Sequence, residues 1–224
     1  MLMDKLAKIL SRVDFNAIWP KFRAFPFATE NVDCADVELL AADAVRGMFY
    51  AFQKEQGESR YPDNSAFSRY PADLDNCNLK LAENFYLVKA CMEASEVDLQ
   101  QFAALRRARA RIIGREMLAL ELAVETVEGM AEFAALSALN QINRGKFIDE
   151  IEKHMAALRN PENLLKPQKS AHSSGCILCF ALKNLNIDFN HDLTDKRPLF
   201  DFVPRQVSIV EKALNSSILP QSII

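Results

Sequence analysis

The stretch of sequence that most constrains the fold runs from Asp98 to Asn143, because it contains no proline and only two glycines. Proline breaks or kinks a helix and glycine weakens one, so such a stretch favours helix. Apolar residues recur every three or four positions along this and other long segments, which is the period of an α-helix. We therefore expect a mainly α chain with at most a small β-sheet, in which this stretch forms one helix or two that break near Gly114.

Other segments carry weaker structural signals. Asp36 to Gln53 has an unbroken i, i+3, i+4 pattern of apolar residues, which predicts the best-defined helix of the first half. Gln56 to Asp75 contains two prolines and many small polar residues, which predicts a loop that is either functional or mobile. A short strand is an option at Phe22–Thr29, and Pro161–Ser174 is expected to be a connector.

Composition excludes several classes of protein. Of the 224 residues, 50% are hydrophobic and 25% are charged, so the chain can bury a substantial core, and we expect a single domain over residues 1–224. The formal charge of -3 gives no general attraction to nucleic acid or to anionic membranes. No segment predicts a signal peptide or a membrane span, and the five cysteines fit reduced thiols, so a cytoplasmic protein is expected.

Four carboxylates fall on one face of the long predicted helix. They are Glu121, Glu125, Glu128 and Glu132. Their i, i+4, i+7, i+11 spacing in an almost wholly apolar segment has two interpretations. The row is either a solvated face or part of an enclosed site, because a buried carboxylate needs a cation or a metal ion beside it. The arginines just upstream that could supply such charge are Arg106, Arg107, Arg109, Arg111 and Arg115.

Two segments resemble the zincin metallopeptidases, which have a His-Glu-x-x-His helix followed far downstream by a glutamate in a Glu-Gly-x-Ala context. The sequence EGMAEF, which begins at Glu128, resembles the downstream motif, with Glu128 at the position of the zinc ligand. The sequence RGMFYAFQ, residues 46–53, resembles a His-Glu-x-Phe-His-x-x-Gln helix. The resemblance implies a zincin-like helical core, in which the histidines and the downstream glutamate hold zinc and the other glutamate is the general base.

The residues that hold and use the metal ion in that family are replaced in this chain. Arg46 and Tyr50 stand at the histidine positions, and Gly47 stands at the position of the general base. Because an arginine offers only hydrogen-bond donors and keeps its proton, we expect no metal and no zinc hydrolase activity at this site. We expect instead that Arg46 projects towards Glu128 and Glu125, and that Tyr50 donates its hydroxyl to the same cluster.

Three kinds of function are open from the sequence. The first is a non-catalytic, peptidase-like protein, a pseudoenzyme without a cofactor, whose cleft binds a peptide or protein partner. The second is an enzyme with a carboxylate-based metal site on the Glu121–Glu132 helix, whose oxygen ligands favour magnesium, manganese or calcium. The third is a helical structural or interaction module, in which the resemblance is accidental and the acidic row is solvated.

Histidine and cysteine residues give weaker signals for a site. Cys176 and Cys179 follow His172 and make up half of a zinc ligand set, but as residues of a predicted helix they fit small core residues better. His154 lies outside any Glu-x-x-His motif, and His191 has no partner in its polar loop. A satisfied or exposed side chain is the interpretation that we adopt for His154.

Overall fold

Gly114 divides the longest helix into two arms. The computed structural model describes residues 2–24, 36–71, 73–190 and 193–204, and in it α5 spans Glu96–Ile142. Gly114 has a φ of 81° and a ψ of 160°, a conformation that is essentially restricted to glycine. Arg109 and Glu121 would lie about 18 Å apart along a straight helix, yet their side chains approach to 2.5 Å. The N-terminal arm (96–113) and the C-terminal arm (115–142) therefore fold back towards each other, and the sequence-based prediction of a break is confirmed.

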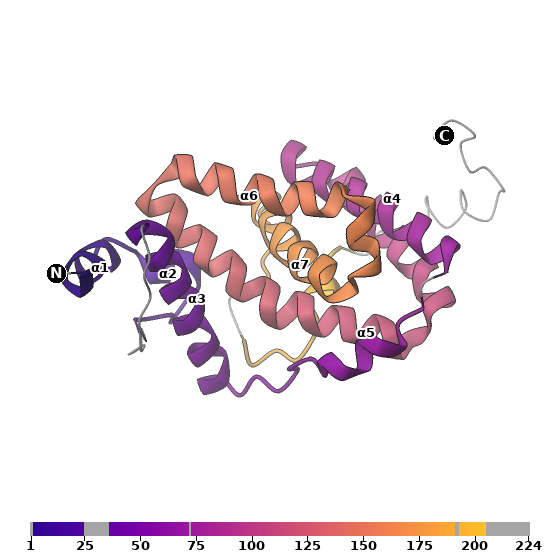
Figure 1. The fold of residues 1–224 in the computed structure, drawn as a ribbon, viewed down its shortest axis with the longest axis horizontal. Helices are drawn as coiled ribbons and strands as arrows, with labels where there is room; N and C mark the ends of the chain where they lie inside the picture. The colour runs from indigo at the N-terminus through magenta and orange to yellow at the C-terminus, as the bar shows by residue number, and fades with distance from the viewer. Residues whose placement is uncertain (1, 25–35, 72, 191–192, 205–224) are drawn as a thin grey trace.

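The remaining helices are α1 (Leu2–Leu10), α2 (Phe15–Ile18), α3 (Val37–Glu55), α4 (Leu74–Glu93), α6 (Arg144–Arg159) and α7 (Pro167–Asn184), with short 3-10 helices η1 (Asn64–Arg69), η2 (Pro161–Leu165) and η3 (Leu199–Phe202). Most of them pack against α5, whereas α1 packs on α3 and η2 packs on α4, α6 and α7 (Figure 1). The part of the chain that the structure describes contains no strand, which confirms a mainly α fold. Most of the optional strand at Phe22–Thr29 lies outside the described residues.

Polar side chains define where the helices begin. The carboxylate of Asp36 accepts hydrogen bonds from the amides of the first turn of α3, and Asp73 does the same for α4. The expected connector at Pro161–Ser174 is wrong, because η2 occupies its first part and α7 already begins at Pro167. A proline at the first position of a helix loses no hydrogen bond, so Pro167 starts α7 rather than interrupting it.

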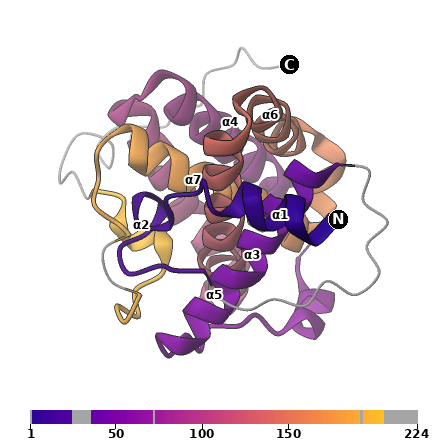
Figure 2. The same ribbon diagram turned by 90° about the vertical axis from the view of Figure 1, so that its left-hand side faces the viewer.

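One continuous hydrophobic core joins residues from α1 to the segment after η3. Trp19, Phe22 and Phe49 pack edge to face in it, and so do Phe133 of α5 and Phe180 of α7. At the end of the molecule that carries the N-terminus, α1 lies against α3 (Figure 2). The core thereby holds α3, α7 and the C-terminal arm of α5 together.

Helices α5 and α7 cross at two glycines. A Cβ atom on Gly129 would lie 2.5 Å from Cα of Gly175, and one on Gly175 would lie 2.3 Å from the main-chain oxygen of Glu125. Both distances are shorter than non-bonded atoms tolerate, so only glycine allows the two backbones to come this close. The crossing sets His172, three residues before Gly175, within reach of the carboxylate row.

Candidate functional site

Helix α3 and the C-terminal arm of α5 run antiparallel, and the sequences RGMFYAFQ and EGMAEF lie side by side on them. Arg46 Nη2 donates to Glu132 Oε1 at 3.1 Å, and Gln53 Nε2 donates to the main-chain oxygen of Val127 at 3.1 Å. Residue numbers thus rise along α3 as they fall along α5. Tyr50 lies between these contacts, and burial together with the charge of Glu128 raises the pKa of Tyr50 to about 12. The two positions to which the resemblance assigns histidines, Arg46 and Tyr50, therefore lie beside Glu132 and Glu128.

The prediction that Arg46 projects towards Glu128 and Glu125 is wrong, because Arg46 pairs with Glu132, one helical turn beyond Glu128. Arg46 Nε lies 2.7 Å from Glu132 Oε2, and Arg46 Nη1 donates to Asp43 Oδ1 at 2.7 Å. The half-buried carboxylate of Glu128 makes no hydrogen bond or ion pair with any described residue, and nor does the hydroxyl of Tyr50. Gly47, to which the resemblance assigns the position of the general base, is exposed, and a Cβ atom there would meet nothing within 4 Å.

Two histidines complete the surroundings of Glu132. His154 Nε2 of α6 lies 3.3 Å from Glu132 Oε1, and His172 Nε2 of α7 lies 3.3 Å from Glu132 Oε2. Burial opposes ionisation of Glu132, but the hydrogen bonds from both histidines and the charge of Arg46 outweigh it, so the pKa of Glu132 lies below its usual value. We call Arg46, Glu132, His154 and His172 the Glu132 cluster.

The Glu132 cluster is held together by an arginine. Arg46 contacts both carboxylate oxygens of Glu132, the same two oxygens that the histidines contact, and a guanidinium cannot ligate a metal ion. Within the described ranges, no group of three or more His, Cys, Asp or Glu side chains is arranged to hold a metal ion. Cys176 and Cys179 are fully buried, and burial raises the pKa of both thiols, which fits core residues; His191 lies outside the described residues.

The other two carboxylates of the row are fully buried between the arms of α5. Glu121 accepts hydrogen bonds from Nη1 and Nη2 of Arg109 at 2.6 and 2.5 Å. Glu125 accepts from both Nη atoms of Arg106 and, at 2.7 Å, from Ser174 Oγ of α7. The solvated-face interpretation is therefore wrong for these two glutamates, and the upstream arginines supply their counter-charge.

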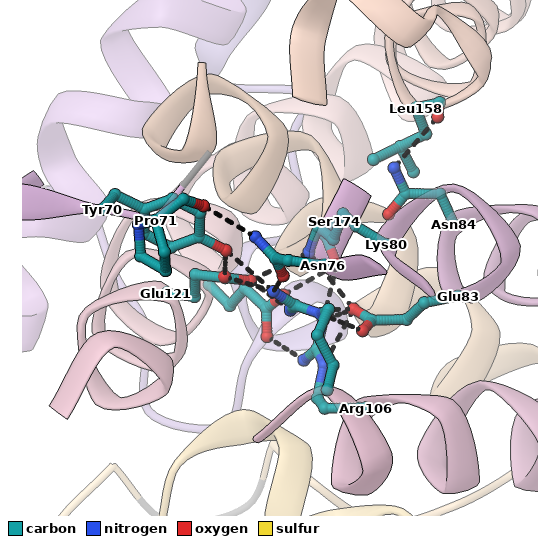
Figure 3. A network of polar contacts seen from close by, with 12 residues as sticks. Tyr70, Pro71, Asn76, Lys80, Glu83, Asn84, Arg106, Glu121, Leu158 and Ser174 are labelled. Carbon is teal, nitrogen blue, oxygen red and sulfur yellow. Dashed lines mark hydrogen bonds and ion pairs between the residues drawn. The ribbon is translucent and has the colours of Figure 1, made fainter. Parts of the chain in front are cut away.

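Helix α4 contributes a third carboxylate and a third cation to the same place (Figure 3). Glu83 accepts from Arg106 Nη2 at 2.6 Å and from Arg109 Nε at 2.8 Å, and Lys80 Nζ donates to Glu121 Oε2 at 3.0 Å. Three cations balance three carboxylates, so the net charge of the group is zero. We call it the hairpin network, and its members are Lys80, Glu83, Arg106, Arg109, Glu121 and Glu125.

Opposite charges within the hairpin network hold four of its members, Glu83, Glu121, Arg106 and Arg109, in their ionised forms. Burial raises the pKa of Glu83, but the charges of Arg106, Arg109 and Lys80 outweigh burial and bring it to about 2. The pKa of Glu121 lies well below its usual value for the same reason, and burial of the two arginines is outweighed by the carboxylates, which raise the arginine pKa values. Glu83, Glu121, Arg106 and Arg109 are therefore charged at neutral pH, although they lie in the interior.

The long segment between α3 and α4 is anchored to this network. Tyr70, directly after η1, donates its hydroxyl to Glu121 Oε1 and accepts from Arg109 Nη1 at 2.8 Å. Near the start of the segment, Lys196 Nζ donates to the main-chain oxygen of Gly57 at 2.6 Å. The predicted loop at Gln56–Asp75 thus includes η1 and the first two residues of α4, and is tied down near both ends.

Sequence reasoning found the carboxylates but missed several of their partners. Lys80 and Glu83 have ordinary spacing for a solvated helix face, and nothing in their neighbourhood marks them as buried. His154 and His172 are 18 residues apart in sequence and meet only because α6 and α7 both pack on α5. Among the arginines between residues 106 and 115, Arg106 and Arg109 are buried, whereas Arg107, Arg111 and Arg115 are exposed.

No family model, no curated protein and no solved structure matches the chain. None of the helices in the described ranges is both long and apolar enough to cross a lipid bilayer. Function is therefore inferred from the residues and their geometry.

Proposed function

We propose that the chain is a non-catalytic, zincin-like protein, in which an arginine-centred ion cluster stands where a peptidase holds its metal ion. The observation that carries this proposal is the register of α3 against α5. The segment RGMFYAFQ lies antiparallel to EGMAEF, with Arg46 on Glu132 and Tyr50 beside Glu128. A functional motif of this family needs the same two helices in contact, because its ligands come from both.

The replacements at the motif remove the parts that hydrolysis requires. Arg46 cannot ligate zinc, and its guanidinium neutralises Glu132 in place of a dication. Gly47 has no side chain that could take a proton from a bound water. We therefore expect that the purified chain does not hydrolyse peptides through this site.

The polar surface around the motif supports a binding role for a peptide or protein partner. Arg46 and His172 are partly exposed, with side-chain exposures of 33% and 29%, and Gly47 is open to solvent. Glu128 is a half-buried carboxylate without a hydrogen-bond partner among the described residues, so a donor group of a ligand would find an acceptor there. The proposal is a pseudo-peptidase that binds at this surface without cleaving.

The proposed enzyme with a carboxylate-based metal site gains no support from the geometry. Glu121 already accepts from Arg109 and Lys80, and Glu125 from Arg106 and Ser174, so both carboxylates are neutralised. A dication would have to displace buried cations, at a large electrostatic cost.

Rebuilding the motif tests the proposal. We expect the triple variant Arg46→His, Gly47→Glu, Tyr50→His to bind one zinc ion per chain, as measured by inductively coupled plasma mass spectrometry after dialysis. The space around Gly47 accommodates a side chain, and Arg46 and Tyr50 are only partly buried. Adding Glu128→Gln should abolish this binding, because Glu128 would be the third protein ligand.

The matched control is the same triple variant with Glu132→Gln in place of Glu128→Gln. Zinc binding that depends on Glu132 and not on Glu128 would show that the metal sits among Glu132, His154 and His172, outside the zincin-like position. A folded triple variant that binds no zinc would also contradict the proposal. Circular dichroism of each variant establishes that it is folded.

A further inference from the structure

Three polar groups between α3 and α5 have oxygen atoms without a hydrogen-bond partner. The hydroxyl of Tyr50 and the half-buried carboxylate of Glu128 make no hydrogen bond or ion pair with a described residue. Gln53 is fully buried, and its Oε1 atom has no partner within the described ranges, although its Nε2 atom donates to Val127. A buried acceptor without a donor is costly and uncommon in a folded protein. We call Tyr50, Gln53 and Glu128 the acceptor site.

The register of the two helices brings the acceptor site together. Gln53 follows Tyr50 by three residues on α3, which places the two side chains on one face of the helix. The amide group of Gln53 contacts the main chain of α5 at Val127, directly before Glu128. Burial and the charge of Glu128 raise the pKa of Tyr50 to about 12, so the carboxylate lies near the phenol. The three groups therefore lie within about one turn of each helix.

Among the described residues, no cation pairs with the acceptor site. Arg46 is the single arginine of α3, and it donates to Asp43 and to Glu132. Lys54 is the single lysine of α3, and its exposed side chain makes no ion pair with a described residue. The charge of Glu128 is therefore left without a counter-charge in direct contact.

The chemistry of the acceptor site favours an ammonium group as its ligand. Calcium and magnesium ions require about six to eight oxygen ligands, whereas this site offers a single carboxylate and two neutral oxygens. A water molecule would satisfy an acceptor but would leave the charge of Glu128 unpaired. An ammonium group carries one positive charge and three N–H donors, which matches the charge and the number of acceptors. Tyr61, which is 49% exposed and influences the pKa of Tyr50, adds a second aromatic ring that a cation can contact.

We propose that the acceptor site binds a lysine side chain of a peptide or protein partner, with the ammonium group donating to Tyr50, Gln53 and Glu128. The inference rests on the proposed function, because it names the chemistry that the pseudo-peptidase recognises. The side chain enters beside Tyr50 and Glu128, which are partly exposed, and reaches the buried oxygen of Gln53 last. Lysine suits this path because its apolar stem is slender, whereas the planar guanidinium of arginine is wider and directs its donors into one plane.

Peptide pools with one fixed residue test the proposal. The fixed central residue is lysine, arginine, norleucine or glutamate, and the flanking positions are randomised among uncharged residues. Fluorescence anisotropy of each labelled pool with the full chain measures binding. We expect the lysine pool to bind at least about tenfold more tightly than the norleucine pool, because norleucine keeps the apolar stem and lacks the ammonium group. We also expect it to bind more tightly than the arginine pool.

Two variants and a matched control locate the lysine site. Glu128→Gln removes the charge of the acceptor site at constant size and should abolish the preference for lysine. Glu116→Gln removes the same charge at an exposed position of α5 and should leave the preference unchanged. Gln53→Met removes the buried acceptor and should weaken lysine binding without lowering the urea midpoint. A lowered midpoint together with unchanged lysine binding would show that Gln53 only supports the fold, and would overturn its place in the site.

The possible outcomes distinguish this inference from the proposed function. Equal binding of all four pools overturns the lysine site and leaves the peptide-binding role of the pseudo-peptidase standing. A preference for lysine that persists in Glu128→Gln also overturns the inference, because the ammonium group is then recognised elsewhere on the chain. Failure of every pool to bind contradicts both the lysine site and the peptide-binding role. An arginine pool that binds as tightly as the lysine pool overturns the choice of an ammonium group.

Discussion

Arg109 donates two nearly parallel hydrogen bonds to Glu121, which lies twelve residues further along the same helix. The pair forms only because the chain reverses at Gly114, so the reversal and the buried ion pair depend on each other. Each arm of α5 presents charges that water cannot reach, and the other arm neutralises them. The fold of the central hairpin is thus linked to its electrostatics, and each of these features can be tested separately.

Arg109→Ala should lower the free energy of unfolding by about 3–5 kcal/mol, because it leaves Glu83 and Glu121 buried without a full counter-charge. Urea denaturation measures the change. Arg107→Ala is the control, since Arg107 is exposed two residues earlier on the same helix, and it should cost less than about 0.5 kcal/mol. Equal effects of the two variants would contradict the assignment of the hairpin network as a structural core.

Gly114→Ala should destabilise the protein by about 1–3 kcal/mol, because a residue with a Cβ atom is strained at a φ of 81°. The same substitution at Gly47 should be neutral or stabilising, because Gly47 is helical, exposed and has open space around it. Thermal unfolding of both variants makes the comparison. An unchanged unfolding temperature for Gly114→Ala would show that the chain does not reverse between the two arms of α5 at this residue.

Gly175→Ala should be among the most damaging single substitutions, because the added methyl group would lie against main-chain atoms of Glu125 that cannot move aside. We expect a loss of several kcal/mol in unfolding free energy or a failure to fold. Gly145→Ala provides the comparison, since a Cβ atom there is 3.4 Å from a single side-chain atom of Asn143. Similar stabilities of the two variants would contradict the close crossing of α5 and α7.

The free energy of unfolding should fall as the pH is lowered from 4.5 to about 2. The pKa of Glu83 falls from 4.5 to about 2 on folding, so its ionisation stabilises the folded state fully above pH 4.5 and that stabilisation is lost as pH falls through the folded value. Above pH 4.5, the ionisation of Glu83 contributes roughly 3 kcal/mol to the free energy of unfolding. Urea midpoints measured across this window test it.

Two variants sharpen this pH test. Glu83→Gln should flatten the profile, whereas Glu116→Gln, at an exposed position, should leave it unchanged. A Glu83→Gln profile as steep as that of the wild type would contradict the assigned role of Glu83.

Arg46→Ala should lower the free energy of unfolding by about 1–3 kcal/mol, which is less than the loss expected for Arg109→Ala. The reason is that the side chain of Arg46 is one-third exposed, so water can solvate part of the site. The histidines still contact Glu132 in this variant. Asp43→Ala is the control for the exposed side of the same arginine and should have little effect. A loss from Asp43→Ala as large as that from Arg46→Ala would contradict the assignment of Glu132 as the principal partner.

The pattern of residues predicts the helices better than it predicts their contacts. The apolar period around Val45 and the glycine at 114 lie within the local sequence, so α3 and the break in α5 are predictable. The partner of Arg46 is set by how far α3 slides along α5, and one turn of sliding separates Glu128 from Glu132. That offset depends on packing of the whole core. For the same reason, Lys80 cannot be recognised as buried from its neighbours.

Tyr70 links the segment between α3 and α4 to charges that lie in the interior. Releasing that segment would remove the hydroxyl donor of Tyr70 from the buried carboxylate of Glu121. The free energy of local opening should therefore be as large as that of a defect in the core. Amide protons near Tyr70 should therefore exchange with solvent deuterium as slowly as those of α5, through cooperative unfolding of both elements together.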